Sequence, residues 1–228
     1  MKTNTVIQGD CLELMKDIPD GSVDMILADI PYGEVSKQGA ERAKYSGQLR
    51  RIDKGAADIS TFDLGSYLME SARVCSGSVY IFCGIEQVGK IYEYFKNDKN
   101  FMVRQCAWRK TNPAPVNGQH LWLSSFENCI FAKRRKTKFN QSCKSSVWDY
   151  PVGRSKLHPT QKPLALFEYL IESSTNEGDL VLDNVAGSGT TGVACQNLNR
   201  NFILMEQEPE YVEIIKKRLK LNKEEPND

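Results

Sequence analysis

"LVLDNVAGSGTTG", residues 180–192, is the stretch that decides the fold. A short apolar run ends in a carboxylate and leads into a turn where Gly187, Gly189 and Gly192 have the spacing G-x-G-x-x-G. Glycines let the backbone approach a ligand closely, and the first N–H groups of the following helix are unpaired. Glu206, about 20 residues further on, can accept hydrogen bonds from a ribose diol. The stretch therefore predicts a strand, a turn and a helix that bind a nucleoside.

Outside this unit, short apolar runs alternate with helix-like segments along the chain. Helices are expected from Pro163 and from Pro209, where proline suits the first helical position. The alternation is typical of a mainly parallel sheet covered by helices, and 228 residues without an internal repeat predict one domain. Two polar stretches, about 33–61 and about 134–156, lack this pattern and are expected to be long surface loops. The apolar runs are residues 5–7, 25–27, 79–82, 129–131, 180–182 and 202–205.

Composition excludes some classes of protein. Charged residues make up 26% of the chain and the formal net charge is +1, so any surface that binds nucleic acid must be local. The seven cysteines are an odd number without a Cys-x-x-Cys pair, and there are two histidines. We therefore expect a reduced, cytoplasmic protein without a metal site. The N-terminus lacks the apolar core of a signal peptide, and no apolar run is long enough to span a membrane.

Four acidic residues, Asp10, Asp29, Asp183 and Glu206, each follow an apolar run. One such acid alone is more often the cap of the next helix. In a doubly wound sheet, however, the carboxyl ends of parallel strands lie at one edge, where ligands bind. Four acids beside a glycine turn therefore predict a binding site at that edge. The turn alone also fits a nicotinamide cofactor, whereas a P-loop is excluded because no Gly-Lys-Ser/Thr follows.

The segments DIPY (29–32), HPTQKP (158–163) and DNVAGSGTTG (183–192) together resemble the β class of amino-methylating DNA methyltransferases. The segment WRKTNPAP (108–115) is similar to one found in the short adenine methylases of that group. The resemblance covers nearly the whole chain. It implies a doubly wound, mostly parallel, seven-stranded Rossmann-like sheet with circularly permuted motif order. It also implies a single methyltransferase domain, residues 1–228, of the short form without a separate target-recognition domain.

The resemblance implies a role for each residue of DIPY. An exocyclic amine is a poor nucleophile, because its lone pair is delocalised into the base. The Asp29 carboxylate and the Ile30 carbonyl would each accept a hydrogen bond from one N–H group of this amine. Pro31 would stiffen the loop. Tyr32 would stack on a base flipped out of the duplex. Ile30 stands where the family usually has proline, which removes the φ restriction there, while Pro31 still favours an extended Ile30. We expect the activity to be retained.

The cofactor implied by the resemblance is S-adenosylmethionine. Asp10 and Cys11 would lie near its adenine and Glu206 on its ribose. Residues 183–191 would surround the methionine part, and residues of HPTQKP would contact its carboxylate end. Val185 replaces an aromatic residue usual in the family, so weaker cofactor binding is expected. The cofactor-binding residues implied are Asp10, Cys11, Asp29, His158, Lys162, Asp183, Val185, Gly187, Ser188, Gly189, Thr190, Thr191 and Glu206.

Basic residues in the two polar stretches are candidates for contacts with DNA phosphates, since lysine and arginine supply most sequence-independent affinity. By base rate a basic run is a solvated face. The run KRRKTK, residues 133–138, is nevertheless expected beside the catalytic edge, and the first loop could close over DNA. The candidate DNA-binding residues are Arg42, Lys44, Arg50, Arg51, Lys133, Arg134, Arg135 and Lys136.

The sequence thus predicts an S-adenosylmethionine-dependent DNA methyltransferase acting on adenine N6. Aspartate at position 29 favours adenine, because the cytosine-N4 members more often carry serine there. Cytosine N4 methylation remains an alternative, as does a catalytically weak DNA-binding relative, suggested by Ile30 and Val185. An oxidoreductase would leave DIPY and HPTQKP unexplained. Double-stranded DNA is the expected partner, and the resemblance adds a homodimer and a cognate restriction endonuclease in a prokaryotic or phage setting.

Overall fold

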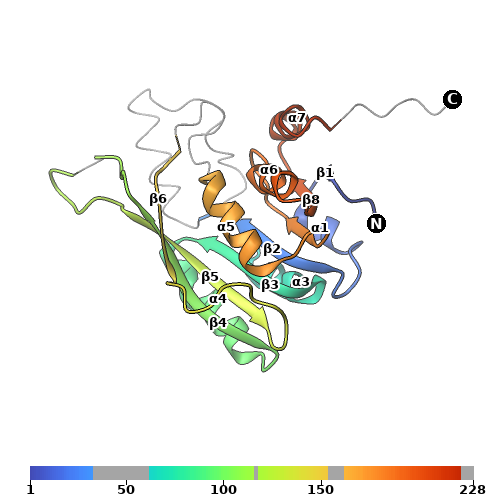
Figure 1. Ribbon diagram of the computed structural model, residues 1–228, viewed down its shortest axis with the longest axis horizontal. Helices are drawn as coiled ribbons and strands as arrows, with labels where there is room; N and C mark the ends of the chain where they lie inside the picture. Colours follow the sequence, from blue (N-terminus) through green and yellow to red (C-terminus); the bar gives the residue numbers. More distant parts are fainter. Residues whose placement is uncertain (33–61, 116–117, 154–161, 222–228) are drawn as a thin grey trace.

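The computed structural model describes residues 1–32, 62–115, 118–153 and 162–221 (Figure 1). Several predictions concern other parts of the chain. The polar stretch 33–61 with its four basic candidates, and His158 of HPTQKP, lie outside the described residues. The basic candidates concerned are Arg42, Lys44, Arg50 and Arg51.

The described strands form a single eight-stranded sheet in the order β1-β8-β7-β2-β3-β5-β4-β6. All of its strand pairs are parallel except the two made by β5, which runs antiparallel to β3 and to β4. The predicted α/β class and mostly parallel sheet are confirmed. The strands are β1 (Thr5–Gln8), β2 (Val23–Asp29), β3 (Cys75–Cys83), β4 (Phe101–Lys110), β5 (Phe126–Arg134), β6 (Val147–Tyr150), β7 (Leu180–Asp183) and β8 (Asn201–Glu206).

The strand β6 lies within the stretch expected to be a surface loop, and it raises the strand number above the seven expected. It pairs in parallel with the end of β4, with Trp148 opposite Trp108. Trp148 is buried, and its ring centroid lies 6.4 Å from that of Phe82. The Trp108 indole donates to the carbonyl of Tyr150 at 2.9 Å. Burial of these tryptophans therefore turns part of a polar stretch into an edge strand.

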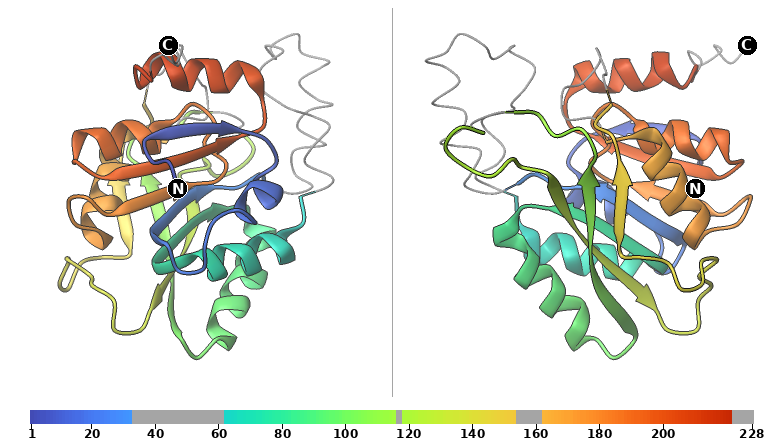
Figure 2. Two further views of the ribbon diagram at one scale, coloured as in Figure 1. Left: turned by 90° about the vertical axis from the view of Figure 1, so that its right-hand side faces the viewer. Right: turned by 60° about the vertical axis from the view of Figure 1, so that its left-hand side comes forward.

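Helices cover both faces of the sheet, as Figures 1 and 2 show. The helices expected from Pro163 and Pro209 are present: α5 has Pro163 as its N-cap, and α7 starts at Pro209. Buried residues of α1, α3 and α4 join one core cluster, and those of α5, α6 and α7 join the other. The helices are α1 (Cys11–Met15), α3 (Leu64–Val74), α4 (Ile85–Asn97), α5 (Leu164–Ser174), α6 (Thr190–Asn197) and α7 (Pro209–Arg218). No described helix is long and apolar enough to cross a membrane.

The period of two along a strand divides the residues of β2 between the two cores. Ile26 and Ala28 belong to the α1–α3–α4 core, whereas Met25 and Leu27 belong to the α5–α6–α7 core. By the same alternation the next residue, Asp29, lies on the α5 side of the sheet. The end of β2 thus presents the Asp29 carboxylate toward the residues that lead into α5.

The topology also accounts for the permuted order of the motifs. The strand β2, which carries DIPY, comes early in the chain, and the glycine-turn strand β7 comes late, yet the two pair side by side. The first strand, β1, pairs with the last, β8. The carboxyl ends of β1, β8, β7, β2 and β3 therefore lie at one edge of the sheet. Because β5 is reversed, its first residues reach this same edge.

Candidate active site

The segment Asp29–Tyr32, at the end of β2, is fixed by contacts to β3 and α4. The Ile30 amide donates to the Phe82 carbonyl at 3.2 Å, and the Pro31 carbonyl accepts from the Gln87 side-chain amide at 2.9 Å. The Ile30 side chain is buried in the core, so apolar packing holds the backbone where the family usually has the first proline of the motif. Among the described residues, none donates a hydrogen bond to the Ile30 carbonyl.

Asp29 is part of a network of two carboxylates, two ammonium groups and a phenol. Its Oδ2 accepts a hydrogen bond from Lys162 Nζ, and its Oδ1 lies 3.0 Å from the Tyr32 hydroxyl. Lys162 Nζ also lies 3.0 Å from Oε2 of Glu127, and the Tyr32 hydroxyl lies 3.1 Å from the same oxygen. The other oxygen of Glu127 lies 2.9 Å from Lys110 Nζ. Formal charges in this network cancel.

Lys162 precedes α5, and its side chain is only 5% exposed. Its ammonium lies 5.4 Å from the ring centroid of Phe82 and 5.7 Å from that of Tyr32, in the range of cation–π contacts. The sequence assigned Lys162 to the carboxylate end of a cofactor. In the structure its ammonium contacts Asp29 and Glu127, and its contact with a cofactor stays a prediction.

Glu127 and Lys110 are site residues that the sequence analysis missed. Glu127 is the second residue of β5, and Lys110 ends β4. Lys110 stood within WRKTNPAP, but nothing in the sequence around Glu127 marked it. Only the reversed direction of β5, with Asn128 opposite Cys83, brings Glu127 to the carboxyl end of β3. Glu127 could have been predicted only if the antiparallel direction of β5 had been known.

The network has opposite effects on the pKa values of its two carboxyl groups. Burial raises the pKa of Asp29, and the nearby Lys162 ammonium does not fully offset this. Burial also acts to raise the pKa of Glu127, but Lys162 and Lys110 outweigh it and hold that pKa below its usual value. Burial acts to lower the pKa of Lys162, but the two carboxylates outweigh it and raise that pKa. Lys162 therefore stays charged.

The glycine turn after β7 is held by the carboxylate that ends the strand. Asp183 is buried and accepts hydrogen bonds from the Thr191 hydroxyl and, at 3.2 Å, from the Val185 amide. Burial raises the pKa of Asp183 to about 7. Ser188, Thr190 and Thr191 are also buried here. Asp183 thus closes the turn onto α6 by hydrogen bonds within the protein.

Glu206, at the end of β8, faces the same turn. One of its oxygens accepts from the Gly187 amide at 2.7 Å and the other from the Glu208 amide at 2.9 Å. Each oxygen retains a second lone pair for a hydroxyl group. A Cβ added to Gly187 would meet no described residue within 4 Å, whereas one on Gly189 would lie 2.9 Å from Ile215. Both glycines have positive φ, +51° and +77°. These residues fit a nucleoside with a free diol.

Asp10 and Cys11 lie after β1, next to β8 in the sheet. The Asp10 carboxylate caps α1 by accepting a hydrogen bond from the Leu12 amide at 2.7 Å. This is the helix-capping role that one such acid alone more often has. Burial raises the pKa of Cys11 to about 12, so its thiol is neutral. Of the four strand-end acids, Asp10 is the exposed one. The structure therefore brings Asp10, Glu206 and Asp183 to three adjacent strand ends, with Asp29 on the next strand.

Replacing Asp183 with asparagine is expected to flatten the dependence of stability on pH. The folded protein keeps a proton on Asp183 that the unfolded chain releases between about pH 4 and pH 7, so stability falls as pH rises through that window. A pKa difference of about three corresponds to roughly 4 kcal/mol. Urea unfolding at pH 5 and pH 8 measures this, with wild type losing more free energy of unfolding than Asp183→Asn. Parallel losses in the two proteins would contradict the assignment.

The basic run Lys133–Lys136 does not lie beside the catalytic edge, so that expectation is wrong. The strand β5 runs antiparallel to β3: Asn128 pairs with Cys83 at the catalytic edge, and Lys133 pairs with Ser78. Five residues at about 3.4 Å each place Lys133 roughly 17 Å along the strand from that edge. The run is therefore at the opposite edge of the sheet.

Most of these basic side chains also serve the fold. Arg134 donates to the carbonyls of Cys75 and Ala72, at 2.7 and 2.6 Å. Arg135 donates to the Lys99 carbonyl at 2.8 Å, and Lys133 to the Thr137 hydroxyl at 3.1 Å. Lys136 is exposed. Contact between the run Lys133–Lys136 and DNA stays a prediction.

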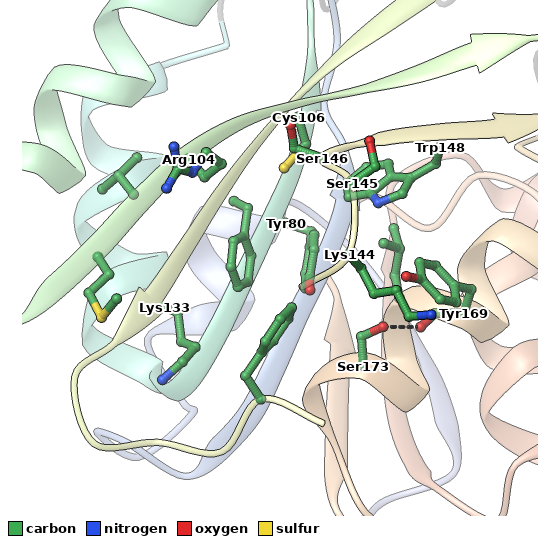
Figure 3. A pocket seen from close by; sticks show the side chains of 15 residues that line it. Tyr80, Arg104, Cys106, Lys133, Lys144, Ser145, Ser146, Trp148, Tyr169 and Ser173 are labelled. Carbon is green, nitrogen blue, oxygen red and sulfur yellow. Dashed lines mark hydrogen bonds between the residues drawn. The ribbon is translucent and has the colours of Figure 1, made fainter. Parts of the chain in front are cut away.

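A cavity of about 270 Å³ lies between β4, β5, β6 and α5 (Figure 3). Its walls include the rings of Tyr80, Phe131 and Trp148, and Lys133 lines it as well. Among the described residues that line it there is none of the four strand-end acids. This cavity is therefore separate from the site built around Asp29.

Comparison with known proteins places the chain in a family. The profile of the N6/N4 DNA methylases matches residues 23–217. The chain is 31% identical to the type II methyltransferase M.HinfI of Haemophilus influenzae over 99% of its own length and 70% of the relative. It is 30% identical to M2.MboI of Moraxella bovis over 95% of its length and 88% of the relative.

Solved structures agree with this. A complex of M1.HpyAVI with SAM has a TM-score of 0.70 and 30% identity, covering 94% of this chain and 98% of that one. The cytosine-N4-specific PvuII DNA methyltransferase has a TM-score of 0.73, covering 100% and 89%, but at 16% identity it shows the fold alone. The match over most of the chain shows that the protein is a DNA methyltransferase of the N6/N4 family.

Proposed function

We propose that the protein transfers the methyl group of S-adenosylmethionine to the exocyclic N6 amine of adenine in double-stranded DNA. The observation that carries the proposal is the pair of acceptors at the end of β2. The Asp29 carboxylate is held by Lys162 and Tyr32, and the Ile30 carbonyl beside it receives no hydrogen bond from a described residue. The cofactor assignment is supported by the M1.HpyAVI relative, which was solved with SAM.

In the proposed mechanism the two acceptors act on the amine directly. The Asp29 carboxylate and the Ile30 carbonyl each accept a hydrogen bond from one N–H group of the amine. This leaves the nitrogen lone pair directed out of the plane of the base. S-adenosylmethionine would supply the methyl group from its sulfonium: the C–S bond breaks as the N–C bond forms, S-adenosylhomocysteine is released, and the amine gives up one proton to solvent. The protein therefore acts mainly by positioning, which can contribute about 7–11 kcal/mol. Tyr32 provides a ring for the base, whose removal from the duplex costs a few kcal/mol.

The cofactor would lie along the carboxyl ends of β1, β8 and β7. Glu206 would accept the ribose hydroxyls with the lone pairs that its two backbone contacts leave available. Asp10 and Cys11 would face the adenine, and the side of Gly187 where a Cβ would meet no described residue would admit the methionine part. Val185 offers less apolar surface than the aromatic ring usual in the family. Asp183 would act through the turn, because its oxygens are bonded to Thr191 and to the Val185 amide.

Cytosine N4 is the alternative target, because its exocyclic amine also presents two N–H bonds. The carboxylate at position 29 favours adenine, since serine is more usual there in the cytosine-N4 members. The named relatives are type II methyltransferases of bacteria, which supports action on a defined duplex sequence beside a cognate endonuclease, in a bacterial or phage-infected cytoplasm. A homodimer remains part of the proposal.

The test is to incubate the protein with methyl-labelled S-adenosylmethionine and unmethylated mixed duplex DNA, RNA, or no nucleic acid. We expect label in duplex DNA at multiple turnovers. DNA binding without label would instead support the catalytically weak relative. Failure to bind the cofactor in calorimetry, combined with binding of a nicotinamide dinucleotide, would support the oxidoreductase.

A further inference from the structure

Two carboxylates in the site share a single buried ammonium group. Lys162 Nζ contacts Oδ2 of Asp29 and lies 3.0 Å from Oε2 of Glu127. The side chains of Asp29 and Glu127 are 30% and 20% exposed, and that of Lys162 is 5% exposed. Lys110 lies 2.9 Å from the remaining oxygen of Glu127. The methyl-transfer mechanism described above uses Asp29 and leaves Lys162 and Glu127 without a role.

To accept a strong hydrogen bond from the target amine, the Asp29 carboxyl group must stay ionised. A carboxyl group in a desolvated site tends to take up a proton, and the neutral acid is a weaker acceptor of the amine's hydrogen bond than the carboxylate is. A nearby ammonium prevents this. An ammonium bound to Asp29 alone, however, would compete with the amine for the same oxygen. A second carboxylate within reach of that ammonium removes the conflict.

We propose that Lys162 and Glu127 are a positioning pair: the Lys162 ammonium keeps Asp29 ionised, and Glu127 offers that ammonium a second partner, which frees Oδ2 of Asp29 for the target amine. When the N6–H bond approaches Oδ2, the Lys162 ammonium moves toward Glu127, which it already contacts. Lys110 holds the other oxygen of Glu127 in place during this shift. Neither residue of the pair needs to touch the reacting atoms. The inference rests on the proposed function, because it supplies the amine that displaces Lys162.

The other contacts of Asp29 do not have to change when Lys162 moves. The Tyr32 hydroxyl lies 3.0 Å from Oδ1, the oxygen that Lys162 does not use. Negative charge on Asp29 acts on the neighbouring strands as well, where it helps to raise the pKa values of Cys83 and Asp183. The titratable groups that face Asp29 among the described residues are Tyr32 after β2, Cys83 in β3, Glu127 in β5, Lys162 before α5 and Asp183 in β7, with Lys110 in β4 behind Glu127.

Titration of the Asp29 carboxyl carbon by NMR in the free protein tests the pair without any reaction. The Asp29→Asn variant identifies the resonance. Lys162→Met is expected to raise the pKa of Asp29, because an opposite charge is lost, and Glu127→Gln is expected to lower it, because a like charge is lost. Lys16→Met, which removes an exposed lysine paired with Glu13, is the control and should leave it unchanged.

The acid limb of the pH–rate profile for methyl transfer should move in opposite directions in the two variants, whereas kcat falls in both. In Lys162→Met the acid limb of the pH–rate profile is expected to move to higher pH, with kcat at pH 7 lower on the order of 10²-fold and cofactor Kd unchanged. In Glu127→Gln the acid limb moves to lower pH while kcat still falls, because Lys162 then stays on Asp29. A purely structural role would lower the folded fraction and leave both acid limbs in place.

Equal or same-direction movements of the Asp29 pKa in the two variants would overturn the proposal. If Lys162→Met does not fold, Glu127→Gln decides alone, since it retains the ammonium: an unchanged or raised Asp29 pKa would refute the pair. If the wild type transfers no methyl group to DNA, the proposed function fails. The NMR titration still reports whether Lys162 and Glu127 set the charge of Asp29.

Discussion

Asp29→Ala is expected to lower methyl transfer to DNA by on the order of 10³-fold, while the affinity for S-adenosylmethionine stays within a few-fold. The carboxylate accepts one N–H bond of the amine, and loss of one preorganised hydrogen-bonding or proton-accepting group typically costs 10²- to 10⁴-fold. The fold should tolerate the change, because Lys162 keeps Glu127 as its partner 3.0 Å away. Single-turnover transfer and calorimetric cofactor binding measure the two quantities.

Two controls make this result specific. Asp17→Ala removes an exposed aspartate near α1 and should retain full activity. Asp29→Asn keeps the size of the side chain and one acceptor oxygen but removes the charge, so its loss should be smaller than that of alanine. Turnover of Asp29→Ala at the wild-type rate would refute the role of the carboxylate.

Gly77→Ala is expected to cost about 3 kcal/mol of stability or more. A Cβ at this position in β3 would lie 2.0 Å from the backbone carbonyl oxygen of Asp24 in β2. The register between these strands shifts at this point, between Val23 and Met25. Overpacking usually costs 1–3 kcal/mol, and here the clash is with backbone that pairs two central strands. At about 2–4 °C per kcal/mol, the melting temperature should fall by roughly 6–12 °C.

The matched control is Gly89→Ala in α4. In the part of the chain that the structure describes, a Cβ at Gly89 meets nothing within 4 Å, and alanine is the better helix former by about 0.5–1 kcal/mol. This variant should therefore be slightly more stable than the wild type in thermal and urea unfolding. A Gly77→Ala protein as stable as Gly89→Ala would show that β2 and β3 do not approach each other as closely as described.

The fold was largely predictable because its main determinants are local. The alternation of apolar runs and helices specifies a covered parallel sheet, and the acids after those runs specify its binding edge. Asp29, Asp183 and Glu206 all end strands as expected. Ile30, the departure from the family motif, is buried, so side-chain packing replaces ring stiffness at that position.

The errors arise where the direction or pairing of a strand depends on distant residues. Nothing in the sequence of β5 indicates that it is reversed, yet this reversal brings Glu127 to the site and moves Lys133 to the far edge. The strand β6 forms because Trp148 is buried against other aromatic rings, which composition alone does not reveal. The HPTQKP motif likewise identifies Lys162 as a candidate but does not show where its side chain points. That direction follows from the packing of α5 on the face that carries Asp29.

The most direct test of the central claim is the chemical identity of the methylated base. Duplex DNA of mixed sequence is methylated with labelled S-adenosylmethionine, digested to nucleosides and separated by chromatography. The acceptor pair of Asp29 and Ile30, with a carboxylate at the first position, predicts that the label co-elutes with N6-methyl-2′-deoxyadenosine. Label in N4-methyl-2′-deoxycytidine, or in neither nucleoside, would contradict it.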